Sequence, residues 1–152
     1  MRKSAILLAV LLLFVACSRD GQGFKIGDVV LADWYQDNWH VGKVLAECKV
    51  DGENAGWTVD FEDNFYDSSE GKEAVCYTLE RIVLNVAPVV GKFKVGDKLL
   101  AEWVEDAFYT AELLKVEGDK YVVKFLADGW ESDVAIDKLR VKPVLAVEGK
   151  KK

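Results

Sequence analysis

Hydrophobic and polar residues alternate with a period of two through most of the chain after residue 23. Trp57, Val59 and Phe61 fall on one side of such an alternation, opposite Thr58 and Asp60. A period of two is typical of a strand that is buried on one face only. The pattern predicts strands over residues 29–34, 39–47, 57–61, 98–103, 108–116, 121–125 and 130–134.

Short turn sequences separate these segments. Glu117-Gly118-Asp119 predicts a tight hairpin turn, and Asp128-Gly129 predicts a turn into the next strand. Leu79-Glu80-Arg81 and Ile136-Asp137-Lys138 each predict one turn of 3₁₀ helix before a further strand. We therefore expect five short strands in each half of the chain.

The two halves are copies of one unit. Residues 24–34 and 93–103 align with seven identical pairs out of eleven, beginning at a shared Phe-Lys and ending at a shared Trp. The offset between the copies is 69 residues here, and it falls to 64 at Phe61 and Phe125.

The offset falls again, to 57, at Arg81 and Lys138. Copy one therefore carries extra residues near 51–56 and 64–75. Insertions are cheapest in surface loops, so we expect both of them there.

The predicted fold class is all-β, with two small five-stranded barrels in tandem. Curling a short sheet into a barrel buries its inner face and reduces its exposed edges. Copy two alone is small enough to be marginally stable, so we expect the copies to pack together or copy one to depend on a disulfide. The predicted organisation is barrel 1 over 24–84 (copy one), a linker over 85–92, barrel 2 over 93–142 (copy two) and a flexible tail over 143–152.

Residues 1–16 have the features of a signal peptide. Arg2 and Lys3 precede an unbroken apolar run from Ala5 to Ala16. The run is too short to cross a membrane, which takes about 20 residues, but it fits the apolar core of an export signal.

The segment Val15-Ala16-Cys17 resembles the lipobox of bacterial lipoproteins, although Phe14 stands where Leu is usual. The resemblance implies a diacylglycerol thioether on Cys17, a lipidated tether over 17–23, and a protein anchored in the bacterial cell envelope, either periplasmic or surface-exposed. Stable anchoring needs more than one acyl chain, which this modification supplies. The alternative is an ordinary cleaved signal with a cysteine nearby.

Charge and composition exclude several functions. Without Arg2 and Lys3 the net charge is 18 − 26 = −8, and an acidic module lacks the clustered Lys and Arg that phosphate contacts need. Nucleic acid is therefore not an expected partner. His40 is the only histidine, which leaves little room for a metal site or His-based catalysis, and we expect no metal and no cofactor.

Cys48 and Cys76 remain once Cys17 is assigned to lipid. Two cysteines in an exported protein favour one disulfide, here internal to copy one. Two separate buried thiols are the alternative.

The repeat resembles the Tudor/Agenet group of SH3-like barrels over residues 24–84 and 93–141. The shared pattern is Gly-Asp, Ala-x-Trp, an aromatic opening the second strand, x-Val-x-Phe and Asp-Gly-aromatic. Copy two shows it at Gly96-Asp97, Ala101-Glu102-Trp103, Tyr109, Val123-Lys124-Phe125 and Asp128-Gly129-Trp130. Copy one shows it at Gly27-Asp28, Ala32-Asp33-Trp34, Trp39-His40, Val59-Asp60-Phe61 and Asp63-Asn64-Phe65.

The resemblance implies an open aromatic box that holds a methylated ammonium or guanidinium by cation–π attraction, with an acid at the rim. The box of copy two would consist of Trp103, Tyr109, Phe125 and Trp130, with Asp128 as the acid. The box of copy one would consist of Trp34, Phe61, Phe65 and either His40 or Trp39, with Asp63 as the acid. Copy two is the better candidate, because His40 replaces Tyr109 and the insertions reshape copy one.

Three classes of function follow from these features. The favoured one is a non-enzymatic, membrane-anchored binding module that recognises an unknown protein, a peptide or a cationic ligand through its aromatic loops. The second is a structural or assembly protein of the cell envelope, in which the same aromatic residues are core. The third is an enzyme, which the sequence disfavours because it has no nucleophile elbow, metal spacing or phosphate loop.

Overall fold

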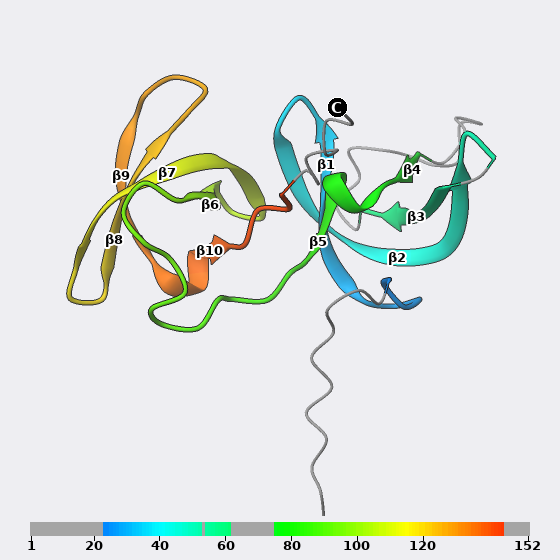
Figure 1. The fold of residues 1–152 in the computed structure, drawn as a ribbon, viewed down its shortest axis with the longest axis horizontal. Coiled ribbons are helices and arrows are strands. Elements are labelled where there is room, and N and C mark those ends of the chain that lie inside the picture. Colours follow the sequence, from blue (N-terminus) through cyan, green and yellow to red (C-terminus); the bar gives the residue numbers. More distant parts are fainter. Residues whose placement is uncertain (1–22, 53, 62–74, 145–152) are drawn as a thin grey trace, which may run out of the picture.

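The computed structural model describes residues 23–52, 54–61 and 75–144 of the 152-residue chain. The signal segment, Cys17, Asp63 and Phe65 lie outside these residues. Strands make up nearly all of the regular secondary structure in the described part, so the predicted all-β class is confirmed (Figure 1).

Copy one contains five strands and one 3₁₀ turn. They are β1 (Val29–Tyr35), β2 (Asn38–Val50), β3 (Asn54–Asp60), β4 (Cys76–Tyr77), η2 (Leu79–Arg81) and β5 (Ile82–Leu84). Copy two repeats the series as β6 (Lys98–Val104), β7 (Ala107–Glu117), β8 (Lys120–Phe125), β9 (Glu131–Ala135), η3 (Ile136–Lys138) and β10 (Leu139–Arg140). The predicted strands and both predicted 3₁₀ turns are confirmed within a few residues.

All pairings are antiparallel, and the two copies share one topology. The order is β5-β1-β2-β3-β4 in copy one and β10-β6-β7-β8-β9 in copy two. The register also repeats, since Ala32 pairs with His40 and Ala101 pairs with Tyr109, its equivalent.

The expectation of closed barrels is not met in the described residues. No ladder joins β4 to β5 or β9 to β10, so each sheet curves around its core but stays open. The 3₁₀ turns η2 and η3 lie between these strands along the chain and take the place of a direct hairpin. The open edges are only two to five residues long, which limits the backbone that is left unpaired.

Each copy has its own apolar core, and a third cluster lies between them. The core of copy one is built on Val30, Ala32, Val44, Trp57, Tyr77 and Ile82. The core of copy two is built on Leu99, Ala101, Ala111, Leu113, Tyr121, Val123, Phe125, Val134 and Leu139. The third cluster, which we call the junction, contains Leu31, Trp39, Leu100 and Phe108.

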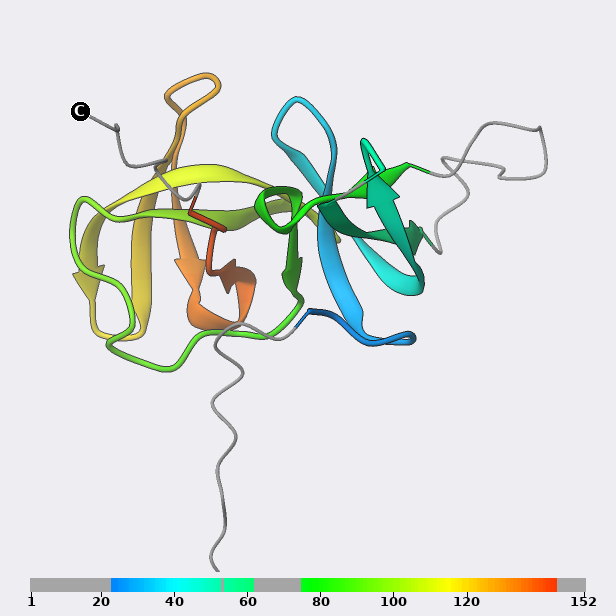
Figure 2. The same cartoon turned by 45° about the vertical axis from the view of Figure 1, so that its right-hand side comes forward.

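Strand pairing continues through the junction. β2 pairs with β7, with Trp39 opposite Phe108. These two residues are 69 apart and so hold equivalent positions in the repeat, which makes the junction nearly symmetric, like the interface of a two-fold dimer. The copies therefore pack together as expected, through one continuous sheet (Figure 2). The domain boundaries given above stay a prediction.

The first insertion of copy one is not the surface loop that we expected. It lengthens the β2–β3 hairpin, whose ladder continues to Val50 and Asn54. Cys48 lies on this extension and forms a disulfide with Cys76 in β4, with an S–S distance of 1.97 Å and a Cα–Cα distance of 6.0 Å. A Cβ on Gly56, which faces Cys48 in the ladder, would come within 2.6 Å of the Cys76 sulfur. Most of the second insertion lies outside the described residues.

Candidate functional site

A cavity opens at one end of the copy-two core. It has a volume of about 160 Å³ and is lined by Trp103, Tyr109, Phe125, Ala127 and Asp128. Since one water occupies about 30 Å³, the cavity has room for a group of about five heavy atoms.

A β-bulge positions Trp103. In the β6–β7 ladder Glu102 faces Phe108 and Val104 faces Ala107, so Trp103 is an extra residue without a partner in the register. Bulges commonly re-aim a side chain at a functional site. Trp34 occupies the same kind of bulge in β1, between Asp33 and Tyr35.

The three aromatic rings of the cavity stand at steep angles to one another. The Trp103 ring centroid lies 6.3 Å from that of Tyr109, at 72°, and 4.6 Å from that of Phe125, at 68°. Phe125 is only 2% exposed and belongs to the core, whereas Trp103 is 42% exposed. The rings therefore form a corner with a buried floor and an accessible wall.

The turn between β8 and β9 holds Asp128 at the cavity. The backbone N–H of Trp130 donates to Asp128 Oδ1 at 2.9 Å, and the N–H of Gly129 donates to the Phe125 carbonyl at 2.9 Å. Gly129 has a φ of +78°, which suits glycine. The turn leaves the second carboxylate oxygen of Asp128 able to accept from a ligand.

Four of the five residues predicted for the copy-two box line this cavity. The exception is Trp130, which is 63% exposed and is not part of the wall. Trp130 contributes to the turn through its backbone, since its carbonyl oxygen also accepts a hydrogen bond from the Phe125 N–H at 2.8 Å.

The structure brings together less of the copy-one set. Trp34 lies edge-on to His40, with ring centroids 5.9 Å apart at 88°, as Trp103 lies to Tyr109. Phe61 packs on the copy-one core beside Tyr77, and the two ring centroids are 6.0 Å apart. Asp63 and Phe65 fall outside the described residues.

Trp39 is not a binding residue candidate in the structure. It is 2% exposed, packs in the junction, and donates its indole N–H to Asp37 Oδ1 at 3.0 Å. Trp39 is buried because it pairs with Phe108 of the other copy. The strand pattern of copy one alone could not indicate this pairing.

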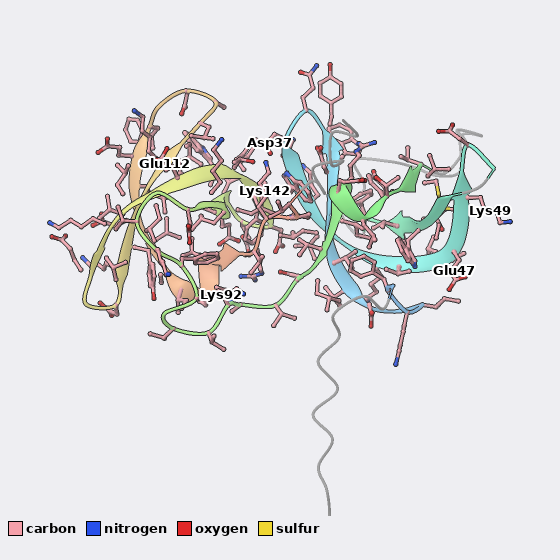
Figure 3. The ribbon with its side chains drawn as sticks, in the orientation of Figure 1. Asp37, Glu47, Lys49, Lys92, Glu112 and Lys142 are labelled. Carbon is pink, nitrogen blue, oxygen red and sulfur yellow. A yellow bond between two sulfur atoms is a disulfide. The ribbon has the colours of Figure 1, made fainter. Side chains whose placement is uncertain are left out.

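A polar cluster that the sequence did not indicate fixes the junction. Asp37, at the β1–β2 turn, accepts from the Thr110 backbone N–H at 3.0 Å and from Lys142 Nζ at 3.0 Å, and the Thr110 hydroxyl also donates to it. Figure 3 shows Asp37 and Lys142 close together between the two copies. Lys142 also lies 5.9 Å from the centroid of the Trp39 ring.

The electrostatics of this cluster favour an ionised carboxylate. Burial works to raise the pKa of Asp37, but hydrogen bonds from the Thr110 hydroxyl, the Trp39 indole and Lys142 outweigh it and hold that pKa below its ordinary value. Asp106 takes the equivalent turn position in copy two but is exposed. The contacts of Asp37 to Thr110, Trp39 and Lys142 distinguish the two turns.

Two further features are absent from the described part of the chain. Residues 23–52, 54–61 and 75–144 contain no group of three His, Cys, Asp or Glu side chains arranged to hold a metal ion. They also contain no helix that is long and apolar enough to span a membrane.

No protein-family model matches this chain, and no curated protein matches it significantly. Among solved structures it is similar to tandem Agenet domains 3–4 of ADCP1, at 19% identity and TM-score 0.48, over 78% of this chain and 79% of that one. It is similar to the AGD34 unit of Arabidopsis thaliana AGDP1 at 18% identity and TM-score 0.49, over 78% of this chain and 82% of that one.

A further similar structure is the SHH1 SAWADEE domain in complex with an H3K9me3 peptide, at 18% identity and TM-score 0.48, over 78% of this chain and 100% of that one. Likeness at this level assigns neither a family nor a ligand to this chain. Its function has to be argued from the chemistry of the cavity.

Proposed function

We propose that this chain is a non-enzymatic binding module that holds a peptide or partner protein by a methylated or otherwise weakly hydrated cationic group. The observation that carries the proposal is the corner of three aromatic rings at Trp103, Tyr109 and Phe125, with Asp128 beside it. The proposed site is the copy-two cavity.

The ring faces supply the attraction. A cation within about 6 Å of an aromatic centroid gains about 0.5–2 kcal/mol per good contact. A plain lysine ammonium is compact and strongly hydrated, so it loses more on leaving water than a methylated ammonium does. The Asp128 carboxylate adds a charge of opposite sign, and a trimethylammonium group has about the size that the cavity admits.

Copy one differs at the positions that make the cavity. His40 stands at the position of Tyr109, whereas Trp39 lies in the junction just as its equivalent Phe108 does. We therefore propose one site of this kind and assign it to copy two.

We also propose that the module is exported and lipid-anchored at Cys17 in a bacterial cell envelope. The support is the apolar run of residues 5–16 followed by Cys17. Mass spectrometry of the protein from bacterial membranes should find an N-terminal peptide that begins at an acylated Cys17. An unmodified Cys17 in the mature protein would contradict the anchor and leave the proposed site untouched.

A structural or assembly role is the second candidate, and the burial of Phe125 favours it. Trp103 packs at 4.6 Å on a residue that is part of the core, so the Trp103 ring also has a packing role. In this case the mutation of Trp103 would lower stability, and no cationic ligand would protect the fold.

Fluorescence titration separates the two candidates. The mature protein should respond to a trimethyllysine peptide and less to the unmethylated peptide, and the Trp103→Ala variant should lose the response. Trp130→Ala is the matched control, because it removes a more exposed tryptophan from the same end of copy two and should keep the response. Thermal melting should first show that both proteins are folded. An equal fluorescence response of Trp103→Ala and the parent to the trimethyllysine peptide would then contradict the proposal.

A further inference from the structure

The end of the molecule opposite the β8–β9 turn exposes apolar side chains in loops. The turn of residues 24–28 and the first part of the linker, residues 85–92, lie at this end, at the bottom of Figures 1 and 2, and Lys92 marks it in Figure 3. We call the exposed apolar residues here the linker face. They are Ile26, Val86, Val89 and Val90, which are between 63% and 82% exposed.

The turn that carries Ile26 is rigid, and the equivalent turn around Val95 in copy two is held in the same way. The Lys25 N–H donates to Asp28 Oδ2 at 2.9 Å, and the Lys94 N–H donates to Asp97 Oδ2 at 2.8 Å. The following glycines donate to the opposing strands, Gly27 to the Val44 carbonyl and Gly96 to the Leu113 carbonyl. Ile26 and Val95 thus point outward from equivalent, fixed turns, where folding gains nothing from an apolar side chain.

The linker face carries a small positive charge within an acidic protein. Residues 23–29 and 85–92 carry Lys25 and Lys92 against Asp28, a sum of 2 − 1 = +1, while the whole chain carries −6. Both lysines are exposed. Exposed apolar residues ringed by lysine are typical of a surface that meets anionic lipid headgroups.

The length of the chain ahead of this face limits its distance from an anchor at Cys17. Phe24 is held in place, because the Trp57 indole N–H donates to its carbonyl at 3.1 Å and the two rings pack at 5.1 Å. Five residues lie between Cys17 and Gly23, so even a fully extended chain spans at most about 20 Å between them. A lipid on Cys17 would therefore keep this end of the molecule near the bilayer.

From these observations we infer that the linker face is a membrane-contact surface that seats the double unit on an anionic bilayer. Its orientation rests on the proposed anchor at Cys17. Val89, Val90 and Ile26 enter the headgroup region, and the lysines lie among the lipid phosphates. The β8–β9 turn, which carries Asp128, lies at the opposite end, so the proposed binding site faces away from the membrane (Figures 1 and 2).

Paramagnetic broadening in bicelles tests the orientation. Cys17 is the only cysteine outside the disulfide, so residues 17–152, made without the signal segment and therefore unlipidated, can be coupled through it to a maleimide lipid in phosphatidylcholine/phosphatidylglycerol bicelles. A gadolinium-chelating lipid headgroup should then weaken the amide signals of residues 25–27 and 86–92 several-fold more than those of residues 36–38 and 127–129. Because the coupling is chemical, this result does not depend on natural lipidation or on ligand binding.

Variants test the chemistry of the contact. Val89→Asp/Val90→Asp should reduce the difference between the two ends to what the tether at Cys17 alone imposes, whereas Leu126→Asp, at an exposed apolar residue of the β8–β9 turn, should preserve it in full. Lys25→Ala/Lys92→Ala should weaken the binding of the uncoupled protein to anionic vesicles, by about fivefold for each lysine. Equal broadening of both ends would overturn the inference. Linker signals that shift with protein concentration in the absence of lipid would also overturn it, because they would show a contact between copies of the chain.

Discussion

At the scale of single residues, two neighbouring motif positions take different roles, and each role is the same in both copies. Trp39 and Phe108 are equivalent and face each other in the junction, while their neighbours His40 and Tyr109 face Trp34 and Trp103. The pattern of one copy alone could not distinguish Trp39 from His40 as a box residue. The alternation of strand residues shows which face a side chain takes, but not whether another copy covers that face.

Asp37 provides a prediction at this scale. Its pKa in the folded protein is lowered, so its contribution to stability is present above the unfolded pKa of about 3.9 and is lost as the pH falls through the lower, folded value. Asp37→Asn should therefore lower the free energy of unfolding at pH 7 by about 1–3 kcal/mol. The difference in the free energy of unfolding between the parent and the variant should shrink as the pH falls below about 4.

Urea denaturation across pH 2–7 measures this effect. The control is Asp106→Asn, which changes the exposed aspartate at the equivalent turn of copy two and should leave stability nearly unchanged. If the two variants lost the same stability at pH 7, the contacts of Asp37 to Thr110 and Lys142 would contribute nothing.

At the scale of elements, the sequence predicted the strands well and their long-range pairing poorly. Strand positions follow from the alternation around residues such as Trp57 and Tyr121, which is local information. The β2–β7 pairing depends on where two distant edges meet, and no local pattern determines that. The bulges at Trp34 and Trp103 were likewise not predicted, although the repeated Ala-x-Trp motif marks both of them.

A disulfide between Cys48 and Cys76 joins the extended β2–β3 hairpin to β4. A disulfide of this kind contributes about 2–4 kcal/mol, mainly by restricting the unfolded chain. Cys48→Ser/Cys76→Ser should lower the free energy of unfolding by this amount, as measured by urea denaturation. A reductant should lower the free energy of unfolding of the parent by the same amount and leave that of the variant unchanged. Equal stability of the reduced and oxidised parent would contradict the prediction.

At the scale of the whole molecule, the junction makes one unit of two copies. Phe108 is 2% exposed and packs with Trp39, and the Arg140 guanidinium lies 5.1 Å from the centre of the Phe108 ring. Because each copy has few residues to form a core, we expect neither to be stable without the other. The parent should unfold in a single cooperative transition.

Phe108→Ala tests this cooperativity. Truncating a buried phenylalanine costs about 3–5 kcal/mol, and here the cost falls on the contact between the copies. Calorimetry should show a lower melting temperature for the variant, while the exposed Val104→Ala control should melt like the parent. Two independent transitions in the parent protein would show that the copies fold separately.

The proposed function depends on one cavity in this unit, and the indole N–H signals of the five tryptophans report on it directly. In a titration of the mature protein with a trimethyllysine peptide, followed by ¹H–¹⁵N NMR, the Trp103 signal should shift in a saturable manner. The buried Trp39 and Trp57 signals should stay in place, and the unmethylated peptide should shift Trp103 much less. A Trp103 signal that does not move, or one that moves equally with both peptides, would contradict the proposed site.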